Sequence, residues 1–284
     1  LYTYTSENLW DANWNMVGNP YLSYYDLDSI KGFTYPVVTW NGVGYDTYRS
    51  GDDDYHFKPL ESFFIQNVNL SNVTMPICGR ETHTQMTNKT KHMPERREAA
   101  AQTYDVSRWL VDITLSDSSY TDRTRVVFNN EASIEYEIGV DASKMMSGDA
   151  PVLLYSIGKS NEQYSINERP ATVNGELIQL GYYAAYAGTF TLSISRMDTT
   201  FMIYDNVEKQ YVDLSQGDYT FTTESGYNDT RFAMYAIEAP QSPSSLEDVQ
   251  SHDLSNVTLL SITGQTIAEN VNIYTAGHGL RAIT

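Results

Sequence analysis

The strongest constraint on this chain is a two-residue alternation of apolar and polar side chains that recurs in most of its patterned segments. In residues 109–115, "WLVDITL", every second side chain is large and apolar, while Asp112 and Thr114 occupy positions between them. Residues 189–195, "TFTLSIS", repeat the pattern with serine and threonine as the polar partners. Alternation over roughly four to eight residues is typical of a half-buried β-strand. We therefore expect strands here, with these side chains facing the core: Trp109, Val111, Ile113, Leu115, Phe190, Leu192 and Ile194.

Turn sequences separate the alternating segments at short intervals. They are "NGVG" at 41–44, "SGDDD" at 50–54, "VNGE" at 173–176, "SQGD" at 215–218 and "SGYND" at 225–229. The chain also holds 23 tyrosines, and tyrosine, like threonine, favours pleated, half-buried surfaces. Many short strands joined by frequent turns are typical of antiparallel sandwiches. The sequence thus predicts an all-β protein with two antiparallel β-sandwich domains, the larger one jelly-roll-like, and a short C-terminal β tail.

Two changes in composition divide the chain. Residues 82–101 lose the alternation and concentrate basic residues and alanine, and residues 239–251 are rich in proline and serine. Both are typical of linkers or long loops. We therefore expect an N-terminal β unit over 1–81, a β-sandwich domain over 102–238 and a β tail over 252–284.

The charge of the chain disfavours nucleic acids and anionic membrane surfaces as partners. With 18 basic and 36 acidic side chains the formal charge is −18, which repels phosphate backbones and anionic membrane surfaces.

No apolar run approaches the roughly 20 residues that span a bilayer. The single cysteine, Cys78, has no partner for an intrachain disulfide. The chain opens on an extended-type segment without the basic and apolar regions of a signal peptide, so we expect a fragment of a longer protein.

The three consecutive aspartates, Asp52 to Asp54, are the most conspicuous candidates for chemistry. They fall at the second bend of a predicted β-meander, and aspartate and glycine are favoured in bends. A calcium loop of the EF-hand type needs oxygen ligands at alternate positions, which consecutive aspartates do not supply. We interpret them as a solvated turn, with a lone calcium site as the alternative.

Other catalytic and metal-binding motifs are missing from the sequence. The five histidines have no HxxxH or HExxH spacing, and no GxSxG sequence marks a serine nucleophile. A glycosidase needs only two carboxylates beside the scissile bond, and no pair stands out among the 36. We therefore predict a protein that is not an enzyme, and assign no catalytic residue, metal ligand or cofactor.

Clusters of tyrosine suggest a possible contact with sugars. Sugars stack on exposed aromatic faces, whereas tyrosine also fits half-buried strand positions with its ring inside and its hydroxyl in water. Both interpretations stay open, and no ligand-binding residue is assigned. The clustered tyrosines are Tyr21, Tyr24, Tyr25, Tyr182, Tyr183 and Tyr186.

Several longer phrases resemble the C-terminal portion of large secreted or surface proteins of Bacteroidota. They include "WNGVGYDTYRSGDDDYHFKPLESFFIQ", "DRTRVVFN", "LGYYAAYAGTFTL" and "QGDYTFTTESGYNDTRF". In "DRTRVVFN", Arg123 and Arg125 share a strand face, from which they can bridge to acidic neighbours on the next strand. The tail phrase "SITGQTIAE" is similar to the sorting domain read by the type IX secretion system, although "AGHGLRAIT" lacks the expected aromatic and basic residues.

The resemblance implies an extracellular or outer-membrane location and β-sandwich modules of adhesin-like proteins. It supplies no catalytic residues. We therefore expect a non-catalytic module that serves adhesion, glycan contact or structural spacing, with glycans or cell-surface proteins as partners. The rival hypothesis is a glycan-active enzyme or an accessory carbohydrate-binding domain. The sequence leaves the ligand, calcium binding and the oligomeric state open.

Overall fold

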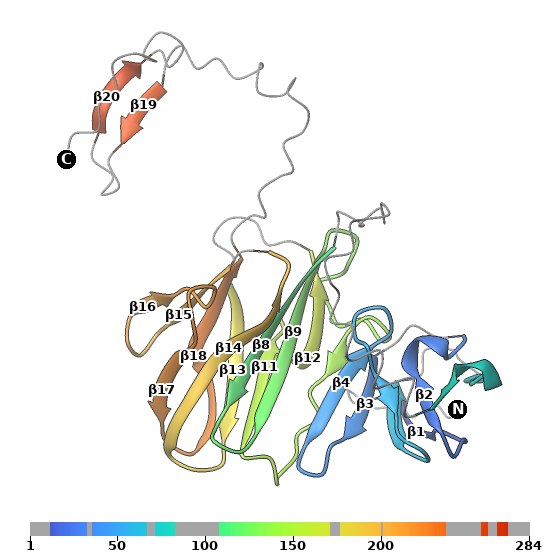
Figure 1. The fold of residues 1–284 in the computed structure, drawn as a ribbon. Helices are drawn as coiled ribbons and strands as arrows, with labels where there is room; N and C mark the ends of the chain where they lie inside the picture. Colours follow the sequence, from blue (N-terminus) through green and yellow to red (C-terminus); the bar gives the residue numbers. More distant parts are fainter. Residues whose placement is uncertain are drawn as a thin grey trace. The chain divides into compact units, whose positions relative to one another are not determined.

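The computed structural model describes residues 12–32, 36–66, 72–82, 108–170, 177–199, 201–236, 257–260 and 266–271. Within these residues the regular structure is β-strand apart from the short 3-10 helices η2 (Leu27–Ser29) and η3 (Ile77–Gly79), which confirms the predicted all-β fold (Figure 1). By its contacts the chain divides into two units, 1–238 and 239–284. The predicted linker over 239–251, and that over 82–101 apart from Thr82, lie outside the described residues.

The N-terminal part of the first unit forms two small antiparallel sheets. The four-stranded sheet has the order β1-β6-β3-β4, and the three-stranded sheet has the order β5-β2-β7. Their strands are β1 (Trp14–Gly18), β2 (Tyr24–Asp26), β3 (Pro36–Trp40), β4 (Tyr45–Arg49), β5 (His56–Phe57), β6 (Ser62–Gln66) and β7 (Arg80–Glu81). The predicted turn at 41–44 joins β3 to β4, and the Asn41 side chain accepts hydrogen bonds from the backbone N–H groups of Val43 and Gly44.

The predicted β-meander is wrong beyond this hairpin. Strand β5 pairs with β2 in the three-stranded sheet, and β6 pairs with β3 instead of β4. The two small sheets share one apolar core to which both contribute, so they pack face to face. Its buried members are Tyr25, Leu27, Ile30, Val37, Phe57, Phe63 and Ile65.

The large sheet contains eleven strands among the described residues. Its path runs β16-β15-β18-β13-β11-β12-β9-β8-β14-β17, with β10 paired to β12. The strands are β8 (Arg108–Ser116), β9 (Thr121–Asn129), β10 (Ala142–Ser143), β11 (Val152–Ile157), β12 (Gln163–Arg169), β13 (Leu177–Ala184), β14 (Gly188–Met197), β15 (Phe201–Asp205), β16 (Gln210–Val212), β17 (Tyr219–Thr223) and β18 (Gly226–Ala236). All pairs are antiparallel except β12 with β9, which is parallel.

The two ends of this path meet, so the sheet curls into a nearly closed, sandwich-like shell. The Tyr219 hydroxyl of β17 is 3.0 Å from Asp205 of β15, and Arg231 of β18 donates to the carbonyl of Thr222 on β17 at 2.7 Å. The shell encloses the main core, to which both predicted alternating strands contribute. Val111, Ile113, Leu115, Phe190 and Leu192 are buried there, with Trp109 and Ile194 packed against them.

The outer face of β8, β9 and β12 is covered by the N-terminal four-stranded sheet. Tyr136, in the loop before β10, donates to the Gln66 side chain of β6 at 2.7 Å. Arg123 of β9 donates to the carbonyl of Thr47 on β4 at 2.6 Å. This covered face, not the shell interior, brings together the polar groups considered below.

The second unit contains the antiparallel hairpin of β19 (Val257–Leu260) and β20 (Thr266–Val271), which falls within the predicted β tail. No helix in the described part of the chain is long and apolar enough to cross a membrane.

Candidate functional site

The three aspartates at 52–54 have different environments. The side chains of Asp52 and Asp53 are only 7% and 10% exposed, whereas that of Asp54 is 72% exposed. The turn that carries them lies against β8 and β9 of the large sheet, because both buried carboxylates bind arginines of these strands. The prediction of a solvated turn is therefore wrong for Asp52 and Asp53.

Arg125 of β9 is the centre of this contact. Its guanidinium is 1% exposed and binds Asp53 through both Nη atoms, at 2.8 and 2.9 Å. The same guanidinium donates through Nε and Nη2 to Asp112 of β8, at 2.6 and 2.8 Å. Arg123, two residues earlier on the same strand face, reaches Asp53 and Asp112 at 3.1 and 3.2 Å. The predicted bridging of these two arginines to acidic neighbours across the sheet is confirmed.

A second set of contacts extends the cluster toward β12. Arg108 of β8 holds Asp52 in a bidentate pair at 2.6 and 2.8 Å and reaches Glu168 of β12 at 3.0 Å. Arg49 of β4 also binds Glu168, and Asn129 donates to the same carboxylate at 2.7 Å. We call these groups the interface ion cluster: Arg49, Asp52, Asp53, Arg108, Asp112, Arg123, Arg125 and Glu168.

The interface ion cluster is balanced, with four arginines against four carboxylates. Burial alone would raise the pKa of Asp53, but its hydrogen bonds to Arg125 and the charges of both nearby arginines outweigh burial and hold that pKa below its usual range. Arg108 and Asn129 likewise keep the pKa of Glu168 below its usual range against the effect of burial. Carboxylates paired with arginines in this way join the two sheets.

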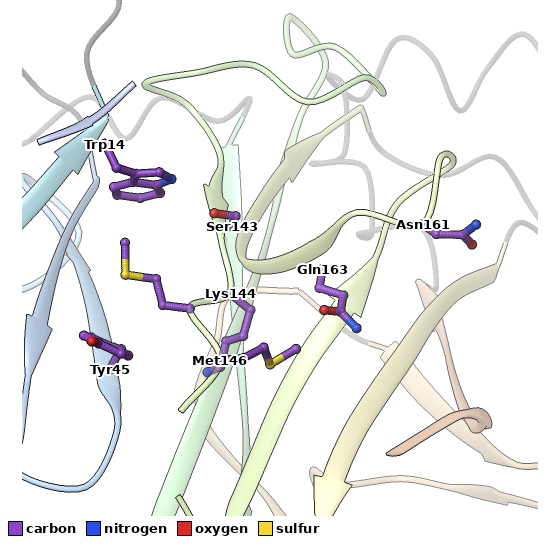
Figure 2. A pocket seen from close by; sticks show the side chains of 8 residues that line it. Trp14, Tyr45, Ser143, Lys144, Met146, Asn161 and Gln163 are labelled. Atoms are coloured by element: carbon purple, nitrogen blue, oxygen red, sulfur yellow. The ribbon is translucent and has the colours of Figure 1, made fainter. Parts of the chain in front are cut away.

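Beside this cluster, a pocket opens at the seam between the N-terminal sheet and the large sheet. Its volume is about 510 Å³. Figure 2 shows Trp14 of β1 and Tyr45 of β4 on one side, and the chain following β10 on the other. We call it the seam pocket, and its lining is Trp14, Tyr45, Ser143, Lys144, Met145, Met146, Asn161 and Gln163.

The lining of the seam pocket combines apolar surface with neutral hydrogen-bonding groups. Two aromatic rings and two methionine thioethers give it broad, polarisable walls. Asn161 and Gln163 each carry an amide that can donate and accept. The one charged group, Lys144, is turned into the protein, where it binds Asp122 with its side chain 1% exposed. The pocket thus suits an uncharged ligand with both apolar faces and hydroxyl or amide groups.

The tyrosine clusters singled out in the sequence do not line this pocket. Tyr25 and Tyr182 are at most 1% exposed and belong to the two cores, and Tyr21 stacks on Tyr25. Tyr186 is 45% exposed, and its hydroxyl donates to Asp117 in the turn between β8 and β9. Alternation does place Trp14 on one strand face, but nothing in the sequence shows that residues 143–146 lie opposite it.

The structure adds little to the other candidates for chemistry. Cys78 is free and exposed. His56, on β5, lies between the carboxylates of Asp54 and Glu81, at 3.0 and 2.9 Å. Among the described residues, no group of three or more histidine, cysteine, aspartate or glutamate side chains is arranged to hold a metal ion.

Comparison with known proteins gives one match. Residues 24–235 match the family described as "Domain of unknown function (DUF8693)". The match spans the two small sheets and the large sheet, apart from β1, so the interface ion cluster lies inside the family's domain. No curated protein and no solved structure matches the chain.

Proposed function

The chain belongs to the DUF8693 family, and on that premise we propose that it is a non-catalytic, extracytoplasmic module that contacts glycans through the seam pocket. The observation that carries this proposal is that Trp14, Tyr45 and the Gln163 amide line one pocket, with Asn161 at its far edge (Figure 2).

The chemistry of the lining matches that of a sugar. The C–H faces of a pyranose pack on aromatic rings, and its hydroxyl groups pair with amides that both donate and accept. The volume of about 510 Å³ falls in the range of roughly 300–1,000 Å³ that is usual for small-ligand sites.

The carboxylates favour binding over catalysis. Glycoside hydrolysis uses two carboxyl groups facing the scissile bond, and the lining of the seam pocket includes neither aspartate nor glutamate. A smaller neighbouring pocket of about 190 Å³ is lined by Asp46 and Asp122, but Asp122 is bound to Lys144. The rival hypothesis, a glycan-active enzyme, needs a pair of carboxylates in a pocket other than the seam pocket.

The proposed location rests on the resemblance to surface proteins of Bacteroidota, with the tail after residue 252 as the sorting element. The two packed sheets suit such a module, because buried bidentate ion pairs fix their relative orientation. Deleting residues 252–284 tests the sorting role, since unchanged surface delivery would remove it.

The test of the binding function is a glycan-array screen of the full chain. We expect selective binding that falls about tenfold or more in Trp14→Ala and Tyr45→Ala, because aromatic contacts dominate such sites. Tyr227→Ala is the matched control, since Tyr227 is an aromatic residue of β18 that is 62% exposed and does not line the pocket. A blank array would overturn glycan contact and favour structural spacing, and hydrolysed glycans in the wells would favour the enzyme.

A further inference from the structure

Lys144 and Asp122 form a buried ion pair. Their side chains are 1% and 2% exposed. Asp122 is the second residue of β9. Lys144 directly follows β10, and its backbone N–H donates to the carbonyl of Gln163 at 2.7 Å. Both partners are therefore held by the sheet, and neither has the freedom of a surface ion pair.

The amine is close to the carboxyl carbon as well as to its oxygens. Lys144 Nζ lies 2.6 Å from Oδ1 and 2.6 Å from Oδ2 of Asp122. Because both oxygens are bonded to Cγ, the nitrogen lies within about 3 Å of that carbon, which meets the distance condition for attack; the amine has to turn from the carboxyl plane toward its face before the bond can form. Fixed pairs at this distance behave as if their effective concentration were far above any attainable in solution.

The surroundings favour the uncharged form of Asp122 and polarise its carboxyl group. Burial raises the pKa of Asp122 above its usual range, although Lys144 and backbone N–H groups oppose that shift. The backbone N–H of Leu154 donates to Oδ2 at 2.6 Å and so draws electron density from the carbonyl. A neutral acid beside a neutral amine is the reactive form for condensation, because the acid is the electrophile and the amine carries the lone pair.

We propose that Lys144 and Asp122 condense without another reagent to an intramolecular isopeptide bond. The lone pair of Nζ forms a bond to Cγ, and the bond from Cγ to one carboxyl oxygen breaks. That oxygen leaves as water, taking the acid proton and one proton of the amine. The product is a neutral amide, which removes the cost of keeping two charges in a dry site.

The smaller neighbouring pocket supplies a route for the proton and the water. Asp122, Ser165 and Asp46 all line it. The buried Ser165 hydroxyl has no hydrogen-bond partner among the described residues, and so is available to relay a proton. The cross-link would join β9 to the segment that walls the seam pocket, independently of whether a glycan binds there.

Mass spectrometry of the denatured full chain tests this proposal. We expect an intact mass lower than the sequence mass by one water molecule. After trypsin, peptide 109–123 should be found joined to peptide 126–159, because a modified Lys144 is no longer cleaved. Lys144→Met and Asp122→Ala should each show their full sequence mass. Lys159→Met should keep the deficit, because Lys159 pairs with Glu135 at the surface.

The chain without substitutions tests the proposal even if the variants at Lys144 and Asp122 fail to fold. A full sequence mass, with peptide 126–144 recovered separately, would overturn the proposal. So would a loss of water confined to a single unlinked peptide, which would indicate a succinimide. The joined peptide alone supports the isopeptide bond, and neither a blank nor a positive glycan array changes that result.

Discussion

Asp112 of β8 lies directly opposite Arg125 of β9 in the antiparallel register, and two nitrogens of Arg125 donate to its two oxygens at 2.6 and 2.8 Å. The remaining side of the same guanidinium binds Asp53, which arrives from the turn after β4. One arginine therefore joins a pair made within the large sheet to a pair made between sheets. This arrangement explains why the turn and the sheet belong to a single compact unit.

Removing Asp53 should destabilise the protein far more than removing Asp54. Asp53→Ala leaves Arg125 and Arg123 buried without one of their carboxylates, and breaking a buried pair in this way costs about 3–5 kcal/mol. Asp54→Ala removes an exposed side chain and should change stability by less than about 0.5 kcal/mol. Denaturant unfolding of the two variants measures both, and equal effects would contradict the buried assignment.

Acid should weaken the interface ion cluster. The folded-state pKa values of Asp53 and Glu168 are lowered, so their pairing stabilises the fold above the unfolded values of about 4 and is lost as pH falls through the folded values. We expect the melting temperature to fall steeply below about pH 4. In Asp53→Ala the same pH series should give a shallower decline; an unchanged slope would show that Asp53 is not the linked group.

Titration of Asp141 should make the fold less stable as pH rises, which is opposite to the effect of Asp53 and Glu168. Burial, with the nearby charges of Glu168 and Glu137, raises its pKa to about 7, although the backbone N–H groups of those residues donate to it. Between about pH 4 and 7 only the folded state keeps this proton, so the contribution to stability falls as pH rises to 7 and is constant above. Carboxyl-carbon NMR should show a midpoint near 7 for Asp141. Asp141→Asn should remove the decrease in stability between about pH 4 and 7. A midpoint near 4 for Asp141 would contradict the raised pKa.

Gly181 of β13 should not tolerate a side chain. A Cβ atom there would collide with the ring of Tyr155 and with the carboxylate of Asp229, which bind each other at 2.7 Å. Gly181→Ala should cost about 1–3 kcal/mol, because neither neighbour can move without breaking that bond. Gly148→Ala, with nothing within 4 Å of the added carbon, is the matched control and should be nearly silent in thermal unfolding.

The strands were predictable because their evidence is local. Alternation in residues 109–115 placed Val111, Ile113 and Leu115 on one face, and these side chains are buried in the main core. The turn at 41–44 was equally predictable, because Asn41 bonds its own following backbone. The pairing of β6 with β3 was not predictable, because nothing in the sequence of β3 or β4 shows which edge of their hairpin β6 will join.

The candidate site was less predictable, because it depends on contacts between distant segments. Asp112 occupies a polar position in an alternating strand, a pattern typical of the solvent face, yet it is 3% exposed under the N-terminal sheet. Trp14 and Lys144 are far apart in the sequence and meet only around the seam pocket. Their relation follows from the docking of two sheets, for which a single sequence carries no signal.

The sequence alone specifies the period of the strands, the position of their turns and which side chains share a face, because each depends on the backbone geometry of a few neighbouring residues. Only the tertiary structure decides whether a polar face meets water or a second sheet. That choice turned Asp52, Asp53 and Asp112 from surface charges into a buried, paired cluster. Its physical reason is that burying a charge is costly unless a partner from another segment arrives to neutralise it.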